Sequence, residues 1–336
     1  MTPIVLPWLK FAACAVLIGI AGPFLVRYGD VIARLTGLSR SWVGLVLLAT
    51  ATSLPELFTG ISAVAAANAP NLAVGDALGS CVFNLVMLVL LDLLSRKAPL
   101  YRVIDQGHLL SAGFGIILIG AAGAFLMLSQ GELRLQFLHI SGYSPFILVL
   151  YLVAMRAVFV YERRAKAFDG ERREEPGITL QGAVARYAAA ASVVVVAGAW
   201  LPFVGQELSD AMGWNATFVG TLFLAAATSI PELVVTVSAM RLGAVDMAVG
   251  NLLGSNLFDI LVLAIDDIAY PNGPLLSSVS PANAISAFAA VVMSGIFIVA
   301  VLYKPETRIR GTVGWVSIAL FLVYLFSSYG IYLFGH

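Results

Sequence analysis

Ten stretches of predominantly apolar residues, each long enough to cross a bilayer, follow one another along the 336-residue chain. A membrane-spanning helix needs about 20 such residues. Hydrophobic residues make up 60% of the sequence and charged residues 11%, against roughly 45–50% and about 25% in soluble domains. The sequence therefore excludes a soluble enzyme and predicts a protein embedded almost entirely in lipid. Its net charge of zero indicates no nucleic-acid partner.

These stretches favour an all-α integral membrane fold with ten transmembrane helices. Hydrophobicity extends around each stretch, whereas the strands of a barrel would alternate over about 10 residues. We expect the spans near residues 4–26, 42–67, 71–94, 106–128, 136–160, 180–202, 215–240, 246–269, 281–303 and 311–334.

The basic residues indicate how the spans are oriented. All 19 lysines and arginines except Lys10 and Arg134 fall on one side of the predicted membrane, in connections or at helix ends. Cytoplasmic loops carry such an excess, so we expect both termini outside the inner or plasma membrane and a charged cytoplasmic linker at 161–177. This linker separates residues 1–160 from residues 178–336, the two halves of one membrane domain.

The two halves contain the same sequence pattern. The segment WVGLVLLATATSLPELFTGISAV from Trp42 aligns with FVGTLFLAAATSIPELVVTVSAM from Phe218, with 12 of 23 positions identical. AVGDALGSCVFNL from Ala73 aligns with AVGNLLGSNLFDI from Ala248, with 7 of 13 identical. Five spans separate the copies, and an odd number inverts the second copy in the membrane. The sequence therefore predicts a 5+5 inverted-topology repeat, and transporters built this way bind substrate near the midplane, between the repeats.

Each copy carries a Thr-Ser-aliphatic-Pro-Glu motif in mid-membrane. Proline lacks an amide proton and clashes with the carbonyl four residues earlier, so we expect the second and seventh helices to be broken there. Each break exposes carbonyl oxygens beside three polar side chains: Thr52, Ser53 and Glu56 in the first copy, and Thr228, Ser229 and Glu232 in the second. Hard cations such as Ca²⁺ prefer an all-oxygen ligand set of this kind.

The two glutamates have no predicted ion-pair partner. A charged residue at the centre of a membrane helix costs about 2.5–3.5 kcal/mol on insertion scales. No lysine, arginine or histidine lies at comparable depth in any predicted span. We therefore expect a bound cation or proton to compensate the charges of Glu56 and Glu232.

The span that follows each motif adds polar side chains on one helix face. Ser80 and Asn84 are four residues apart, as are Ser255 and Asp259, so each pair shares a face near the depth of the glutamates. Glycines at the same spacing favour close packing between helices; they are Gly75, Gly79, Gly250 and Gly254.

The remaining polar residues of these spans are expected to lie outside the site. Asp76 and Asn251 lie about a turn and a half inside their helices, where they suit capping or an entrance role. Three aspartates near the ends of spans are expected to be solvated helix termini: Asp92, Asp266 and Asp267. The two cysteines and three scattered histidines indicate neither a disulfide framework nor a metal cluster, and no cofactor is expected.

The motifs TSLPEL and TSIPEL, each followed by a GS(C/N)xF(N/D) segment, resemble those of the cation/calcium exchanger superfamily. The likeness is to its sodium/calcium exchanger branch, which includes prokaryotic members with ten helices. It implies alternating access, with Ca²⁺ and Na⁺ competing for one central site whose main ligands are Glu56 and Glu232. The other implied lining groups are the side chains of Ser53, Ser229, Asn84, Asp259, Ser80 and Ser255 and the carbonyls of Ala49, Thr52, Ala225 and Thr228.

The sequence also departs from the family pattern. Ala51 and Ala227 stand where many members have glycine, and Cys81, opposite Asn256 of the second copy, is expected outside the ion shell. An aspartate matching Asp259 is associated with potassium coupling in potassium-dependent exchangers, so potassium dependence stays open. Proton-coupled members typically carry a glycine-asparagine version of the glutamate motif, which is absent here.

The sequence thus predicts a secondary antiporter that exchanges Ca²⁺ for Na⁺. The alternatives are a Ca²⁺/H⁺ antiporter, a potassium-dependent Na⁺/Ca²⁺ exchanger and, more distantly, a cation channel; an enzyme is disfavoured because the histidines are few and scattered. The expected partners are Ca²⁺, Na⁺ and the bilayer, with no obligatory protein partner. The first and sixth spans contain glycine and proline and no internal charge, so we expect them to slide as a gate.

Overall fold

Long α-helices dominate the computed structural model, which describes residues 4–35, 49–95, 99–131, 136–137, 139–165, 177–241, 243–305, 308–309 and 313–335. The helices are α1 (Val5–Leu35), α3 (Ala49–Thr52), α4 (Leu54–Ala65), α5 (Pro70–Leu94), α6 (Leu100–Val103), α7 (His108–Ser129), α8 (Tyr143–Ala165), α9 (Leu180–Met212), α10 (Ala216–Phe218), the π-helix η2 (Val219–Leu224), α11 (Ala225–Thr228), α12 (Ile230–Arg241), α13 (Val245–Ala269), the 3₁₀ helix η3 (Leu275–Ser278), α14 (Asn283–Tyr303) and α15 (Trp315–Phe334). Two short antiparallel hairpins pair β1 (Gln136–Phe137) with β2 (Ile140–Ser141) and β3 (Arg308–Ile309) with β4 (Val313–Gly314).

Eight of the described helices are long and apolar enough to cross a membrane. A ninth crossing results if Ala216–Thr228 and Ile230–Arg241 form one span, which is bent by 46° at its break. The apolar helix α4 has only 12 residues, and residues 36–48, where the predicted span 42–67 begins, lie outside the described residues. The structure confirms a helical multi-pass membrane protein, while the ten-helix count stays a prediction.

The helices that contain the predicted first and sixth spans extend beyond those spans at their C-terminal ends. The helices α1 and α9 have 31 and 33 residues, because both continue beyond the apolar stretch into polar sequence that still favours a helix. The helix α8 likewise runs to Ala165, into the predicted linker 161–177, of which residues 166–176 lie outside the described residues.

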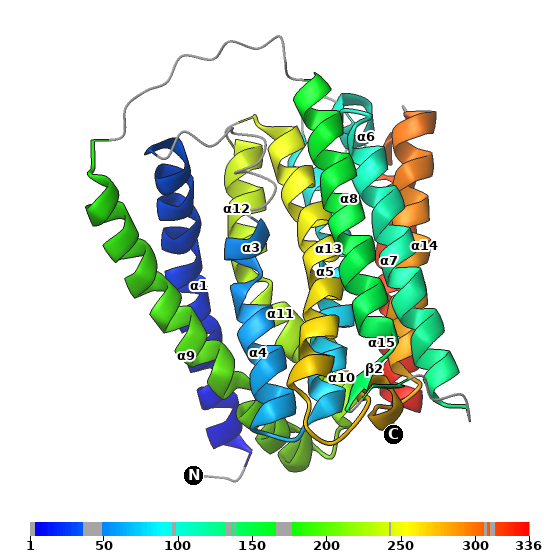
Figure 1. Cartoon of the computed structure of the whole chain (residues 1–336). Coiled ribbons are helices and arrows are strands. Elements are labelled where there is room, and N and C mark those ends of the chain that lie inside the picture. Colours follow the sequence, from blue (N-terminus) through cyan, green and yellow to red (C-terminus); the bar gives the residue numbers. More distant parts are fainter. Residues whose placement is uncertain are drawn as a thin grey trace.

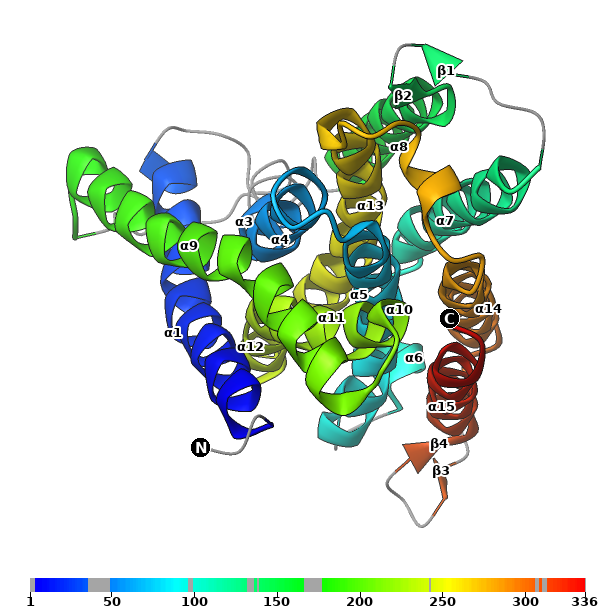
Figure 2. The same cartoon turned by 90° about the horizontal axis from the view of Figure 1, so that it is seen from below.

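The helices form a layered bundle with α5 and α13 at its centre. Figures 1 and 2 show α1 and α9 together on one flank and α7, α8, α14 and α15 on the other. We call the lower end of Figure 1 the termini end, because the N- and C-terminal marks both lie there; α8 ends and α9 begins at the opposite end. The turn from α4 to α5 also lies at the termini end (Figure 1).

Both predicted helix breaks are present, and their backbones are alike. Ser53 separates α3 from α4 with φ −91° and ψ 14°, and Ser229 separates α11 from α12 with φ −80° and ψ 11°. Pro55 and Pro231 follow as the second residues of α4 and α12. A proline is tolerated in the first turn of a helix because its missing amide proton has no partner there. The same local sequence therefore breaks the helix in the same way in both halves.

Two glycines of the flank pack on these prolines in a reciprocal arrangement. A β-carbon at Gly22 of α1 would lie 2.6 Å from Cγ of Pro231, and one at Gly198 of α9 would lie 3.1 Å from the carbonyl oxygen of Pro55. Each half of the chain thus contributes the glycine that contacts the other half's break. The predicted gate helices lie directly on the two breaks.

The glycines of α5 allow close packing, as the sequence predicted. A β-carbon at Gly79 would lie 2.5 Å from the carbonyl oxygen of Thr221, and one at Gly75 would lie 3.0 Å from that of Thr217. Both contacts are with the segment that contains η2, a π-helix that the sequence did not predict. Short π-helical turns within longer helices occur frequently at functional sites.

The expectation that Asp92 and Asp267 are solvated is wrong. Both are buried, and each binds loop backbone in an equivalent way. Asp92 accepts from the amides of Leu100 and Gly314 and the hydroxyl of Ser317. Asp267 accepts from the amides of Leu275 and Ser141 and the hydroxyls of Ser141 and Ser144. The side chains turn inward because folding supplies these donors, which cannot be read from the position of an aspartate near a span's end.

Candidate cation site

The two breaks place both motif glutamates inside the bundle. Glu56 lies in the first turn of α4 and Glu232 in the first turn of α12, and their exposed fractions are 1% and 0%. The N-terminus of a helix carries a partial positive charge, which favours a carboxylate in its first turn. The helix break therefore supports the charge of the residue that it positions.

Hydrogen bonds cross between the two halves at this point. Ser53 Oγ donates to Glu232 Oε1 over 3.0 Å, and Ser229 Oγ donates to Glu56 Oε1 over 3.2 Å. Ser255 Oγ also donates to Glu232 Oε1, over 3.2 Å. The serine of each motif thus serves the glutamate of the other, and the predicted site residues of the two copies form one network.

The second predicted pair, Asn84 and Asp259, joins α5 to α13 in the same region. Asn84 Nδ2 donates to Asp259 Oδ2 over 3.4 Å, and both residues are 1% exposed. Cys81 Sγ lies 3.8 Å from the same oxygen. Cys81 therefore contacts a predicted ligand, Asp259, from one turn below Asn84, and its place outside the ion shell stays a prediction.

The remaining hydroxyls link these groups to one another. Ser80 lies 3.3 Å from the hydroxyl of Ser229, and Thr52 lies 3.4 Å from that of Ser255. All four side chains are 0% exposed. Every serine predicted for the site therefore lies in the central network, and Thr52 lies there with them.

Thr228 makes different contacts from Thr52, its equivalent in the first copy. Its hydroxyl is 3.1 Å from Asp76 Oδ1, to which it can donate, and it also lies within 3.3 Å of the carbonyl oxygens of Leu224 and Ala225. Asp76 is 1% exposed, so it belongs to the buried network. Its position early in the helix predicted a cap or an entrance role instead, because distance along a span does not show that η2 and α11 cover it.

Two of the predicted carbonyl ligands come four residues before the breaks. Ala49 begins α3 and Ala225 begins α11. The carbonyl oxygen of Ala225 already accepts from the amide of Ser229 over 3.1 Å. Its second lone pair is open to a cation when the Thr228 hydroxyl, 3.3 Å away, donates to Asp76 instead.

Four buried groups of the network each leave one oxygen that has no hydrogen-bond partner among the residues the structure describes. These oxygens are Glu56 Oε2, Glu232 Oε2, Asn84 Oδ1 and Asp259 Oδ1. The ion pairs described, Lys10 with Glu207 and His108 with Asp246, lie elsewhere. A buried polar atom without a partner is costly, so four such oxygens in one network form an acceptor-rich site.

The three carboxylates do not converge on a single point. Within the described part of the chain, no three histidine, cysteine, aspartate or glutamate side chains form a ready metal cluster. Each carboxylate instead has its own polar partners: Ser53 and Ser255 for Glu232, Ser229 for Glu56, and Asn84 for Asp259. The site is thus a mixed set of carboxylate, hydroxyl and amide oxygens.

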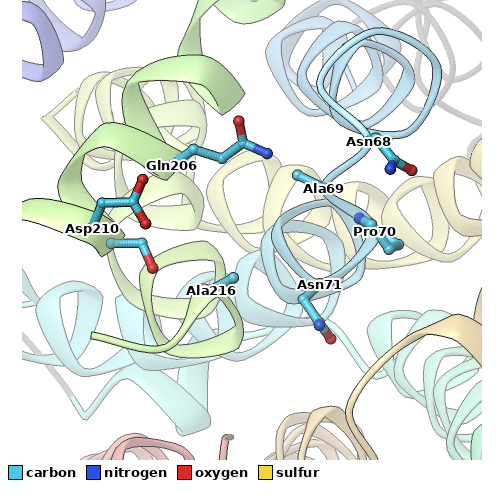
Figure 3. Close-up of a pocket in the computed structure, with 8 residues that line it drawn as sticks. Asn68, Ala69, Pro70, Asn71, Gln206, Asp210 and Ala216 are labelled. Carbon is cyan, nitrogen blue, oxygen red and sulfur yellow. The ribbon is translucent and has the colours of Figure 1, made fainter. Parts of the chain in front are cut away.

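A separate cavity of about 440 Å³ lies at the termini end (Figure 3). It is lined by Asn68, Ala69, Pro70, Asn71, Gln206, Ser209, Asp210 and Ala216. None of the central carboxylates lines it, so it is distinct from the site. Its polar walls lie where α4 turns into α5, beside the end of α9.

The sequence matches the family described as "Sodium/calcium exchanger protein" over residues 6–161 and 183–330. Among curated relatives, the sodium/calcium exchanger MaX1 of Methanosarcina acetivorans is 26% identical over 282 residues, which cover 74% of this chain and 79% of that protein. The inner membrane protein YrbG of Escherichia coli is 25% identical over 251 residues, covering 71% and 72%. A solved structure of the sodium-calcium exchanger NCX_Mj has the same fold, with a TM-score of 0.59 at 21% identity over 96% of this chain and 98% of that chain.

Proposed function

Because this chain belongs to the sodium/calcium exchanger family, whose members are membrane ion exchangers, we propose that it exchanges Ca²⁺ for Na⁺ by alternating access at the central site. The single observation that carries this proposal is the set of four buried oxygens without partners, on Glu56, Glu232, Asn84 and Asp259. Ca²⁺ takes about six to eight oxygen ligands at about 2.3–2.6 Å. The serine and threonine hydroxyls and the carbonyls beside the breaks supply the others.

Competition between the two ions gives exchange. Glu56, Glu232 and Asp259 carry three negative charges when ionised, which one Ca²⁺ or several Na⁺ can balance but both cannot balance together. An uncompensated buried carboxylate is costly, so the site crosses between the two faces only when it is loaded. The serine protons that now point at the glutamates would turn away as a cation arrives.

The proposed architecture has ten helices in a 5+5 inverted repeat. The segment α3–α4, with the residues that precede it, is the second span and corresponds to α10–α12. The contacts of Gly22 with Pro231 and of Gly198 with Pro55 support sliding of α1 and α9 over the breaks. Lys10 of α1 also binds both carboxylate oxygens of Glu207 in α9, at 2.6 and 2.7 Å, which supports movement of the two helices as one unit.

The proposed orientation places both termini outside an inner or plasma membrane and residues 161–177 in the cytoplasm. The distribution of basic residues supports it. The common position of the two termini at one end of the bundle is compatible with an even number of spans (Figure 1).

The test is Ca²⁺ flux into vesicles that contain the purified protein, under an imposed Na⁺, K⁺ or pH gradient. We expect Na⁺ that leaves the vesicles down its gradient to drive Ca²⁺ uptake. Glu56→Gln should abolish this uptake. Asp246→Asn serves as a control, because Asp246 is an exposed carboxylate at the opposite end of α13 from the termini. Flux that follows pH and ignores Na⁺ would identify a Ca²⁺/H⁺ antiporter, flux that also needs K⁺ a potassium-dependent exchanger, and flux that needs no counter-ion a channel.

A further inference from the structure

The two ends of the central helices differ in charge although the helices are related by the repeat. Asp76 and Asp266 lie on the termini side of the site, and the residues at the equivalent repeat positions are Asn251 and Leu91. Asp76 and Asp266 are 1% and 0% exposed, so the expectation that Asp266 is a solvated helix end is wrong. The two halves therefore each contribute one extra buried carboxylate, and both carboxylates lie on the same side of the central site.

Helix geometry aligns these two carboxylates with the central site. Asp266 is seven residues, or about 10 Å, beyond Asp259 and falls on the same face of α13. Asp76, Ser80 and Asn84 follow one another at four-residue spacing and share one face of α5. Because α5 leaves the termini end and α13 approaches it (Figure 1), Asp76 and Asp266 both lie below the site on that side.

Oxygens of both carboxylates lack partners. Among the described residues, neither oxygen of Asp266 nor Oδ2 of Asp76 has a hydrogen-bond partner. When ionised, the two carboxylates repel each other, and Asp76 is repelled in the same way by Glu232 of the central site. Asp76 also receives the Thr228 hydroxyl at 3.1 Å, so the extra carboxylates are connected with the proposed cation ligands.

Space for the Asp266 carboxylate is provided by Gly60 of α4. A β-carbon at Gly60 would overlap both of its oxygens. The repeat equivalent of Gly60 is Thr236, whose hydroxyl accepts from Nδ2 of Asn251 over 3.4 Å. On the termini side a glycine thus lies beside a carboxylate, whereas on the opposite side the equivalent threonine is bonded to a neutral amide.

We propose that Asp76 and Asp266 form a second site for a hard cation, which Ca²⁺ or Na⁺ occupies between the central site and the termini end. Two carboxylates buried without a basic partner need a bound cation or a proton to compensate their charge, and Ca²⁺ binding distinguishes the two. The site raises the local cation concentration on one side of the exchanger only, so the apparent affinity for Ca²⁺ is higher at the termini end. The role of this second site rests on the proposed exchange function, whereas its existence does not.

The existence of the site is tested by equilibrium binding of radioactive Ca²⁺ to the purified protein in detergent without Na⁺. We expect two classes of Ca²⁺ site in the wild type. Asp266→Asn keeps the shape of the side chain and should remove only the weaker class, whereas Glu56→Gln should remove the tighter one. Asp76→Asn, which introduces the residue found at the equivalent repeat position, should weaken the same class as Asp266→Asn, and Asp246→Asn should bind as the wild type does. A single class in the wild type, or an unchanged curve for Asp266→Asn, would overturn the proposal.

Its role is tested in vesicles sorted for one orientation by a tag at the C-terminus. Asp266→Asn should require about 10-fold more Ca²⁺ for half-maximal uptake when Ca²⁺ is offered at the termini end, because one sign of charge in a cleft raises the local ion concentration by at least that factor. An equal change at both faces would overturn the one-sided role. Two Ca²⁺ classes in a wild type that shows no Na⁺-driven flux would leave the second site standing and refute the exchange function instead.

Discussion

Ser53 donates a hydrogen bond of 3.0 Å to Glu232, a residue 179 positions further along the chain. The equivalent bond runs in the opposite sense, from Ser229 to Glu56 at 3.2 Å. Because each serine lies at one helix break and its acceptor follows the other, the two breaks cannot move independently without losing these bonds. The reciprocal pair ties the halves of the repeat together at the proposed ion site.

Replacing either glutamate of this pair should abolish exchange. Glu56→Gln keeps the acceptor oxygen for Ser229 but removes a charge that faces the bound ion. Losing one partner of a buried charge interaction costs that interaction about 3–5 kcal/mol, here in the free energy of Ca²⁺ binding. We expect Na⁺-driven Ca²⁺ uptake to fall by more than about 100-fold. The thermal midpoint should change little, which a melting curve in detergent would verify. Substantial uptake in both Glu56→Gln and Glu232→Gln would remove the glutamates from the site.

Removing a serine hydroxyl should weaken Ca²⁺ binding. Ser53→Ala and Ser229→Ala each delete one proposed ligand oxygen, and a hydrogen bond to a charged group contributes about 1.5–3 kcal/mol. We expect the Ca²⁺ concentration for half-maximal uptake to rise about 10-fold in each variant. Tighter Ca²⁺ binding in either variant would show that the hydroxyls only satisfy the carboxylates and do not bind the ion.

A methyl group at Gly22 should slow exchange. It would lie 2.6 Å from Pro231, and overpacking of this kind costs about 1–3 kcal/mol. We expect Gly22→Ala to reduce the maximal exchange rate about 10-fold, with less effect on equilibrium Ca²⁺ binding. Gly113→Ala in α7 is the matched control, because nothing lies within 4 Å of its β-carbon position. Equal rates in the two variants would argue against sliding at this contact.

Asp267 should be required for stability. Its four hydrogen-bond donors come from β2, α8 and η3, and each donor left unsatisfied costs about 1–3 kcal/mol. Asp267→Ala should therefore lower the thermal midpoint in detergent strongly, and Asp92→Ala should act likewise. Asp210→Asn, at an exposed position in the last turn of α9, should leave the midpoint within a degree or two of the wild type, since surface substitutions change stability by about 0.5 kcal/mol or less. A normal midpoint for Asp267→Ala would show that water replaces the lost partner.

The local features of the site could be predicted well from the sequence. The break at Ser53 follows from Pro55, because proline cannot donate the helix bond, and its repetition at Ser229 follows from the identical motif. The pairing of α5 glycines with a neighbouring backbone also follows from their spacing. In each case the physical cause lies within a few residues of the effect.

The positions of the other aspartates could not be predicted in this way. Asp92 and Asp267 were expected in water, and each instead binds backbone that approaches from a distant part of the chain. Asp76 was assigned to an entrance, and it is buried because η2 and α11 cover it. Depth along a helix does not show what packs against that helix.

The sequence alone determined that the chain lies in a membrane, that its two halves repeat one pattern and that two glutamates follow broken helices, because hydrophobicity, local sequence similarity and proline act locally. Only the tertiary structure decided which oxygens share a network and which are left without partners. It also decided that Asp266, which aligns with Leu91 in the repeat, is buried beside Gly60. Those relationships depend on which helices pack together, and packing brings distant residues into contact that no local pattern encodes.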